Sequence, residues 1–295
     1  MAATMRQQMA RTVGDLLQTD ERLILLLADV STDLFRSLAQ RKPERVINVG
    51  IMEQTMTSVA AGLALEGFIP VLHTIAPFLV ERSFEQIKDD FCYQRLGGNF
   101  ISIGASYDYS TEGMTHHAPG DVQVLRSLPG MQIVIPGTAA EFDELFRDSY
   151  ANGSPTYFRL SVLSNPVSHP ARFGKLTVMR RGEQATVIAV GPALTCTLPA
   201  LEGLDVTLLY CTTVIPFDEE TLRVVHRGQK VVLVEPYYEG VLAQDIYHAL
   251  HGIPVELTAI GVPRAIPTHY GTPEQHNAAN GLTPQDVRRR IEAFL

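Results

Sequence analysis

The sequence predicts an α/β protein of two domains, each built on a mostly parallel sheet flanked by helices. Short apolar runs of strand length alternate with stretches of helical length along the 295 residues. The runs are continuously apolar, which indicates strands covered on both faces. A segment with Asn-Pro and His-Pro turns interrupts the series at residues 163–181. We therefore expect domains over residues 1–162 and 182–295, joined by a linker over residues 163–181.

The elements of the first half follow from local patterns. The run at residues 23–28 is apolar and of strand length, and residues 46–49 are a β-branched run that meets a glycine. A helix follows from Glu53, with Gly67 in the place of a C-terminal cap. The full expected series is a helix at 5–17, strands at 23–28 and 46–49, the helix from 53, a strand at 69–73, a helix at 84–93, strands at 100–104 and 133–135, a helix at 139–150 and a strand at 157–160.

The second half repeats the alternation. Residues 186–191 are an apolar run that ends in glycine, and further strands are expected at 206–210 and 231–234. Helices are expected between these strands and at 240–251. A last helix is expected at 284–294, with proline near its first turn.

Composition excludes several classes of function. Apolar residues make up 45% and charged residues 19% of the chain, which is typical of a globular protein. The net charge is −8 and no extended basic run is present, so we expect neither a nucleic-acid partner nor a membrane-bound protein. Cys92, Cys196 and Cys211 are widely separated and odd in number, which favours buried thiols in a reducing compartment. Without an N-terminal signal pattern, the expected location is cytoplasmic.

The most informative segment is residues 45–54. A short strand meets Gly50, and Glu53 stands at the start of the apolar helix that follows. A carboxylate in this place is either a partner of the helix dipole or a buried functional acid. The junction by itself favours the dipole partner, because acidic residues are common in first helical turns.

Motifs along the rest of the chain favour the functional acid. Residues 45–54 resemble the glutamate motif in the pyrimidine-binding domain of the transketolase superfamily of thiamine diphosphate enzymes. Residues 110–117 resemble the family's acidic-Gly-x-Thr-His-Gln segment, and residues 128–136 resemble its run into the next strand. The resemblance extends in the same order over essentially the whole chain, including residues 269–271 near the C-terminus. It implies a pyrimidine-binding domain followed by a transketolase C-terminal domain.

The resemblance implies roles for residues near the cofactor. Glu53 matches the family glutamate that hydrogen-bonds the pyrimidine ring and promotes the imino form of the cofactor. Phe78 and Phe84 fall where the family places aromatic rings against the pyrimidine, with Phe78 the better match. Asp29, which follows the first strand, matches an acidic residue near the cofactor, and a structural loop cap is an equally good interpretation.

The resemblance also implies residues that face substrate. His116 matches the histidine beside the reactive carbon, and an imidazole can exchange a proton with a substrate oxygen near neutral pH. His117 stands in place of the family's usual glutamine. Glu112 occupies the position where sugar-using relatives carry aspartate, and its extra methylene is expected to alter the donor pocket.

Two departures from the family pattern bear on the acceptor. Relatives that use sugar phosphates carry an arginine just after the strand that closes this domain, whereas Arg159 lies inside the strand and Val162 is nearest to the expected place. A family histidine after the preceding strand is replaced within residues 104–106. We therefore expect an acceptor other than an ordinary sugar phosphate, either an unphosphorylated small molecule or a carrier-bound thiol.

The family's Gly-Asp-Gly…Asn segment, which binds the diphosphate and its magnesium, is absent from the sequence. The expectation is therefore a smaller subunit of a two-chain transketolase-like enzyme, which transfers a two-carbon ketol or acyl unit and is active only with a partner. The partner would supply the thiamine diphosphate and Mg²⁺ site in an α₂β₂ assembly, and no metal ligand is expected in this chain. The alternatives are the beta subunit of a 2-oxo acid dehydrogenase and a non-catalytic binding or scaffold homologue. Deoxyxylulose-phosphate synthase is disfavoured by the missing domain and arginine.

Overall fold

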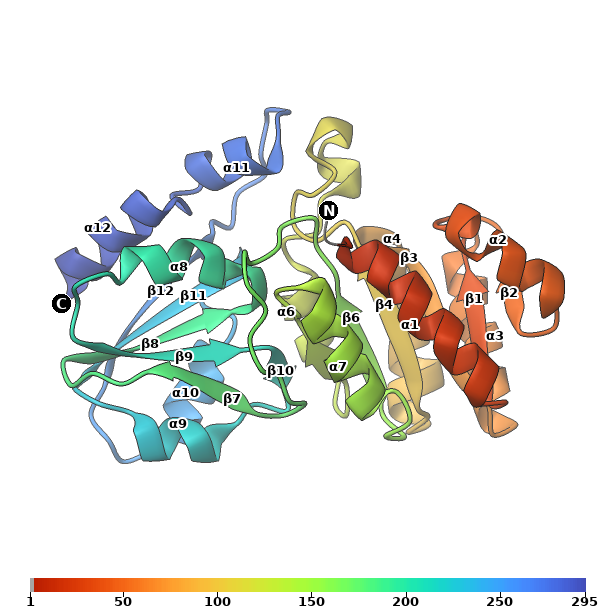
Figure 1. The fold of residues 1–295 in the computed structure, drawn as a ribbon, viewed down its shortest axis with the longest axis horizontal. Helices are drawn as coiled ribbons and strands as arrows, with labels where there is room; N and C mark the ends of the chain where they lie inside the picture. Colours follow the sequence, from red (N-terminus) through yellow and green to blue (C-terminus); the bar gives the residue numbers. More distant parts are fainter. Residues whose placement is uncertain (1–2) are drawn as a thin grey trace.

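The two-domain α/β architecture is confirmed by a computed structural model that describes residues 3–295 (Figure 1). The strands are β1 (Leu23–Leu27), β2 (Val46–Asn48), β3 (Ile69–Ile75), β4 (Gly98–Ile103), β5 (Gln132–Val134), β6 (Pro155–Arg159), β7 (Leu176–Arg180), β8 (Ala185–Val190), β9 (Val206–Cys211), β10 (Thr213–Ile215), β11 (Lys230–Tyr238) and β12 (Glu256–Val262). The first sheet has the order β10-β5-β6-β4-β3-β1-β2, and the second has the order β12-β11-β8-β9-β7. Every pairing is parallel except β10 with β5 and β7 with β9.

The helices lie mostly between successive strands. They are α1 (Met5–Thr19), α2 (Thr32–Arg41), α3 (Glu53–Leu65), α4 (Ala76–Val80), α5 (Phe84–Gln86), α6 (Asp121–Arg126), α7 (Ala139–Ser149), α8 (Leu194–Ala200), α9 (Glu219–Val225), α10 (Ala243–Ala249), α11 (Pro273–Ala279) and α12 (Pro284–Phe294). A π-helical segment η1 spans Ile87–Tyr93, and 3₁₀ turns form η2 (Ser110–Glu112), η3 (Met114–His116) and η4 (Gly191–Ala193). The expected helix at 84–93 is therefore a short α-helical turn followed by a π-helix.

Two strands depart from the expected division of the chain. β7 lies inside the segment expected to be a linker, and it pairs with β9 at the edge of the second sheet. β10 comes from the second half of the chain, yet it pairs with β5 at the edge of the first sheet. Edge strands of this kind are short or only partly buried, so they leave no continuous apolar run in the sequence.

The faces of the first sheet are covered by different helices. Met9 and Val13 of α1 pack with Leu25 on one face, together with α7, whereas Met56 of α3 packs with Leu26 on the other. Consecutive strand residues point to opposite faces, and both faces are buried, which explains the continuous apolar strands.

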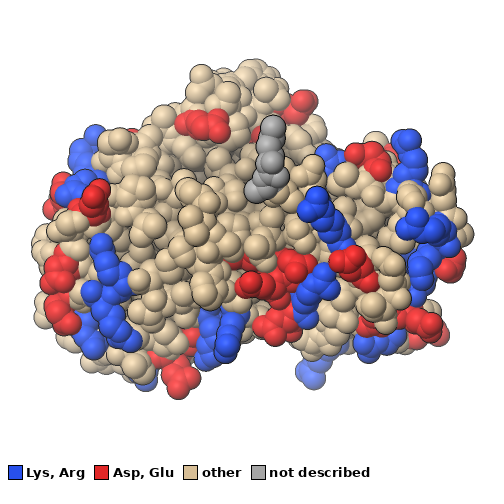
Figure 2. Space-filling view, in the orientation of Figure 1, with Lys and Arg blue, Asp and Glu red and all other residues tan. Residues whose placement is uncertain are grey.

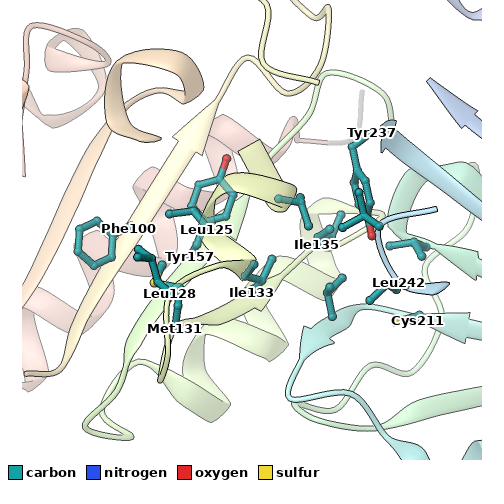
Figure 3. Close-up of a cluster of buried hydrophobic side chains, with 14 of the residues drawn as sticks. Phe100, Leu125, Leu128, Met131, Ile133, Ile135, Tyr157, Cys211, Tyr237 and Leu242 are labelled. Carbon is teal, nitrogen blue, oxygen red and sulfur yellow. The ribbon is translucent and has the colours of Figure 1, made fainter. Parts of the chain in front are cut away.

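One hydrophobic cluster crosses the junction between the domains. Ile133 and Ile135, at β5 and directly after it, belong to the same buried cluster as Cys211, Tyr237 and Leu242 of the second domain (Figure 3). Each of these side chains is fully buried. The domains therefore bury apolar surface against each other, and this burial contributes a free energy of about 25 cal/mol per Å² removed from water. The two domains pack as one body.

Charged side chains are mixed on the surface. Figure 2 shows Lys and Arg interspersed with Asp and Glu, and few charges over the upper central part of the face in view. This pattern agrees with the scattered charges of the sequence. Among residues 3–295, no helix is both long and apolar enough to cross a membrane.

His73 joins three elements at the end of β3. The Oγ of Ser31, which precedes α2, lies 2.9 Å from His73 Nε2 and accepts a hydrogen bond from Arg6 of α1. His73 Nδ1 lies 2.8 Å from the carbonyl oxygen of Ile101 in β4. Complete burial lowers the pKa of His73 from 6.5 to about 4, so the ring is neutral at pH 7.

The stability of the protein is expected to fall with pH between about 6.5 and 4 because of His73. The folded state binds fewer protons than the unfolded state in this window, so acid favours unfolding, by roughly 3 kcal/mol over the full window. Urea unfolding at several pH values should show a shallower dependence for His73→Gln than for the wild type. An unchanged dependence would contradict the assignment, and His251→Gln, on an exposed histidine, serves as the control.

Candidate active site

Glu53 is the first residue of α3 and is only 1% exposed. The strand β2 ends at Asn48, and the chain turns through Gly50 before the helix begins. A buried carboxylate requires a partner, and Arg82 supplies one, with Nη1 at 2.7 Å from Oε2. Among residues 3–295, no hydrogen bond engages the second carboxylate oxygen, Oε1. Glu53 is thus held in place while one oxygen is left for a ligand.

Phe78 and Arg82 lie on α4 and just after it, one helical turn apart. The guanidinium carbon of Arg82 is 4.3 Å from the centroid of the Phe78 ring. Arg82 therefore contacts the Glu53 carboxylate and the Phe78 ring at once. The Arg82 side chain is 38% exposed, so solvent reaches the group formed by Glu53, Phe78 and Arg82 from the side of Arg82.

His116 approaches the same place from another segment. Its ring meets the Phe78 ring edge to face, with centroids 5.1 Å apart, and lies 6.2 Å from the ring of Tyr109. The segment that carries it, η2 and η3, projects at the top of Figure 1. Gly113 separates the two turns at φ 71°, a conformation that favours glycine.

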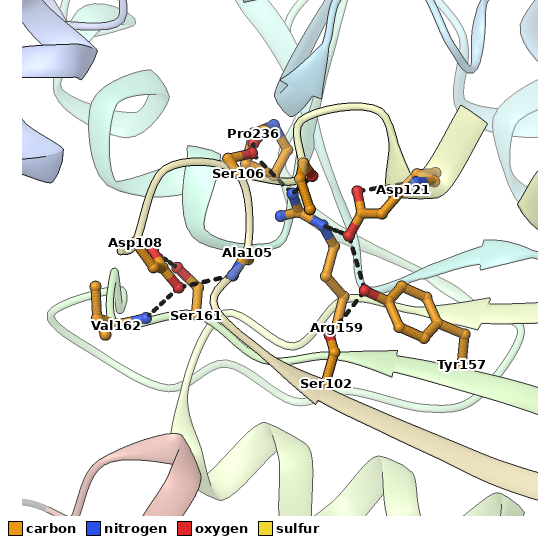
Figure 4. A network of polar contacts seen from close by, with 12 residues as sticks. Ser102, Ala105, Ser106, Asp108, Asp121, Tyr157, Arg159, Ser161, Val162 and Pro236 are labelled. Atoms are coloured by element: carbon orange, nitrogen blue, oxygen red, sulfur yellow. Dashed lines mark hydrogen bonds and ion pairs between the residues drawn. The ribbon is translucent and has the colours of Figure 1, made fainter. Parts of the chain in front are cut away.

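A buried polar network fastens the base of this segment (Figure 4). Arg159 of β6 is 1% exposed and forms an ion pair with Asp121, with Nε at 2.8 Å from Oδ2. Its Nη2 donates to Ser106 Oγ at 2.7 Å and to the carbonyl of Ala118 at 3.4 Å. Ser106 and Ala118 form the β-bridge that closes the segment on which His116 lies. Ser106 also donates to the carbonyl of Pro236, which ties the segment to the second domain.

Asp108 fastens the same segment to the chain that follows β6. Its carboxylate accepts hydrogen bonds from the backbone N–H groups of Ala105 and Val162 and from the hydroxyl of Ser161, at 2.9 to 3.0 Å. The Val162 side chain itself is 66% exposed. Arg159 is therefore a structural residue, and an apolar side chain stands at the surface where the sugar-phosphate relatives are expected to carry arginine.

The structure brings together three of the predicted site residues: Glu53, Phe78 and His116. Phe84 is half-buried and packs against the hydrophobic core, and among residues 3–295 it has no aromatic or cation–π contact with the group formed by Phe78, Arg82 and His116. Asp29 is exposed and exchanges hydrogen bonds with Asn48, as a loop cap would. These two remain predictions.

Glu112 and His117 flank His116 but differ from it in surroundings. Glu112 is exposed on η2, and none of the side-chain hydrogen bonds in the described chain involves its carboxylate. His117 is buried and faces the second domain, where its ring contacts that of His276. Their roles toward substrate remain predictions.

Sequence reasoning missed Arg82 and Tyr109. Arg82 falls between the two phenylalanines that were considered, four residues after Phe78, so helical spacing could have placed it beside that ring. Tyr109 carries no such local signal, because only the fold of the projecting segment brings its ring toward His116.

Comparisons with known proteins identify the family of the chain. Residues 1–166 match the family described as transketolase, pyrimidine binding domain. Residues 174–287 match the transketolase C-terminal domain. The chain belongs to the transketolase family. Transketolase-family proteins generally use thiamine diphosphate, and Glu53, Phe78 and His116 lie in the half of this transketolase-family chain that is named for binding the pyrimidine.

The transketolase relatives include separate subunits. The chain is 42% identical over 289 residues to an uncharacterized 33.6 kDa protein in the fasciation locus of Rhodococcoides fascians, covering 96% of this chain and 92% of the relative. It is 30% identical over 285 residues to a 6-deoxy-6-sulfo-D-fructose transketolase subunit of a Clostridium species, covering 92% and 88%. A solved split-gene transketolase, described as an inactive beta4 tetramer, superimposes with a TM-score of 0.89 at 28% identity and covers 100% of this chain and 99% of that one.

Proposed function

We propose that this chain is the smaller subunit of a two-chain, thiamine-diphosphate-dependent transketolase-like enzyme that transfers a two-carbon ketol or acyl unit. The observation that carries the proposal is the convergence of a buried acid, an aromatic ring and a histidine from three separate segments: Glu53, Phe78 and His116. The likeness to transketolase subunits over nearly the full length of both chains supports the same conclusion.

The residues present fit a thiamine diphosphate pyrimidine. Glu53 would hold a ring nitrogen through its free oxygen, and Phe78 would offer its face to the ring, with Arg82 holding the carboxylate in place. When bound, the cofactor supplies a thiazolium carbon that stabilises negative charge on the transferred carbon unit. His116, whose ring meets that of Phe78 edge to face, would hold or move a proton at a substrate oxygen.

The surface next to Glu53 supports a partner subunit. Ile51 and Met52, which lead into α3, are 69% and 53% exposed, and Val59 on the same helix is 42% exposed. Apolar side chains gathered beside a buried functional acid are typical of an interface. The partner in this proposal carries the diphosphate and Mg²⁺ site, and the assembly is α₂β₂.

The test is a pull-down of the tagged chain from its native cells, followed by mass spectrometry. We expect a partner of similar size that carries a Gly-Asp-Gly…Asn segment, and we expect donor turnover only when both chains are mixed. Ile51→Asp should abolish co-purification, whereas Leu198→Asp, at an apolar position 45% exposed on α8, should not. Recovery of the chain alone, with both variants behaving alike, would contradict the two-chain proposal.

We further propose that the acceptor is not an ordinary sugar phosphate. The position that the family resemblance assigns to the phosphate-binding arginine corresponds most nearly to Val162, whose side chain is 66% exposed. Relatives that are separate transketolase subunits are named both for a sulfo sugar and for a sugar phosphate, so the proposal on the acceptor rests on Val162 alone. A transfer assay that uses a lipoyl acceptor distinguishes this proposal from a 2-oxo acid dehydrogenase subunit.

Val162→Arg is expected to improve the use of a phosphosugar acceptor. One charge-assisted hydrogen bond to a phosphate contributes roughly 1.5–3 kcal/mol, so KM should fall about tenfold or more. Steady-state kinetics of the assembled enzyme measure the effect, and Val167→Arg, at a position 62% exposed in the same segment, is the matched control. A wild-type KM already as low as that of the variant would overturn the proposal on the acceptor.

A further inference from the structure

A cavity lies where the two domains meet, on the side of the projecting segment that His117 faces. Its volume is about 230 Å³. Tyr107 and His117 line it from the first domain, and Val262, Ile266, His269 and His276 line it from β12, the following segment and α11. His116 is not among the lining residues, so this space is separate from the group formed by Glu53 and Phe78.

Two buried histidines in the cavity wall have ring nitrogens without hydrogen-bond partners. His117 is 2% exposed, and neither Nδ1 nor Nε2 makes a hydrogen bond of good geometry within the described chain, although a weak interaction with the Ser110 backbone partly offsets the lowering of its pKa. His276 is 1% exposed, and its Nε2 also has none. A buried polar group without a partner loses its hydrogen bonds to water and gains none in return, so native proteins rarely keep several together without a ligand for them.

The rings are held in place by stacking. The rings of Tyr107 and His269 both stack on that of His276, with centroid distances of 4.9 and 4.7 Å, and the ring of His117 meets it edge-on at 5.4 Å. Such contacts fix the ring planes and therefore the directions of the free nitrogens. The arrangement is ordered before any ligand arrives, which reduces the entropy lost on binding.

The charges around the cavity select the ligand. No Lys, Arg, Asp or Glu lines it, and the titratable groups that face His117 are His116, His269, His276 and Tyr107. Burial lowers the pKa values of His117 and His276, so both rings are neutral at pH 7 and able to take up a proton beside an anion. No group of three or more metal-ligating side chains in residues 3–295 could hold a metal ion, which excludes a metal centre of that kind here.

We propose that this cavity binds a small organic carboxylate, with its anionic group against His117 and His276 and its apolar body against Val262 and Ile266. A phosphate would call for arginine or lysine, and neither lines the cavity. A purely apolar ligand would leave the histidine nitrogens unpaired. Because the anion stabilises an imidazolium, binding is coupled to proton uptake. The proposal does not depend on whether the chain is catalytic.

The test is calorimetric titration of the full chain with propionate, which is ionised at both pH 6 and pH 8. We expect saturable binding at pH 6 that weakens at least tenfold at pH 8. Titrations in two buffers of different ionisation heat should show net proton uptake by the protein. Propionamide, which has the same shape without the charge, should not bind. Equal binding of propionate and propionamide, or no saturable binding of propionate, would overturn the proposal.

Variants locate the site. His117→Gln and His276→Gln should each weaken propionate binding at least tenfold at pH 6, and Ala265→Trp, which fills the cavity without altering a histidine, should abolish it. His251→Gln, on an exposed histidine, should leave it unchanged. Circular dichroism checks that each variant is folded. Propionate binding that survives both histidine variants and the tryptophan variant would place the site elsewhere and refute the assignment.

Discussion

Replacing Glu53 with glutamine is expected to lower turnover of the assembled enzyme by about 10²–10⁴-fold, the range associated with loss of a group that assists proton transfer. Glutamine has nearly the same volume, but its amide cannot carry the charge that Arg82 now balances or accept the same hydrogen bond from a protonated ring nitrogen. The change acts on Oε1, which is left free in the structure, whereas Arg82 Nη1 lies 2.7 Å from Oε2.

Stability and assembly should survive the Glu53→Gln change. Arg82 is 38% exposed on its side chain, so solvent can take over from the lost ion pair. Steady-state kinetics with both subunits give the turnover, and size-exclusion chromatography gives the assembly. Glu66→Gln, an exposed acid just after the same helix, is the matched control. Full activity in the Glu53 variant would refute the proposed mechanism and favour a scaffold role.

Replacing Arg159 with methionine is expected to destabilise the protein by about 3–5 kcal/mol, the cost of leaving one member of a buried ion pair without its partner. Asp121 would keep its hydrogen bond from Tyr157 at 2.7 Å but lose the guanidinium at 2.8 Å. Neither charge has access to water, since Arg159 is 1% exposed and Asp121 is fully buried. The closure of the His116 segment through Ser106 would weaken as well.

The matched control is Arg147→Met, which removes an ion pair with Asp143 at the surface. Its guanidinium side chain is 40% exposed, so a change within about 1 kcal/mol is expected. Urea unfolding at a fixed protein concentration measures both variants. Adding Asp121→Asn to Arg159→Met should recover part of the loss, because it removes the unpaired charge. Equal stability of the Arg159 and Arg147 variants would show that the network is not needed for the fold.

The family and the order of elements follow from local patterns that tertiary packing did not alter. The apolar run at residues 23–28 contains β1, whose side chains are buried on both faces of the sheet. Glu53 is the first residue of α3, as expected. The edge strands β7, β10 and β12 were not foreseen, because edge strands with few buried residues have no continuous apolar pattern.

The candidate site was predictable only in part. Phe78 was proposed from its place between two family motifs, and His116 from the segment at residues 110–117. The fold places the centroids of their rings 5.1 Å apart. The strand-to-helix junction alone could not choose between a dipole partner and a buried acid for Glu53, and only motifs elsewhere in the chain favoured the acid, since burial depends on the segments that cover it. The sequence also contained no sign that Arg82 is the ion-pair partner of Glu53, because the pairing of residues 29 apart leaves no local pattern.

The sequence by itself determined the two-domain α/β class and the family, and it proposed Glu53, Phe78 and His116 as site residues, because these inferences depend on periodicity and short motifs within single segments. The tertiary structure alone decided the pairing of β10 with the first sheet, the ion pair of Arg159 with Asp121, and the cavity lined by His117 and His276. Each of these joins residues distant in the chain, and their energies come from burial and pairing that exist only once the domains have packed together.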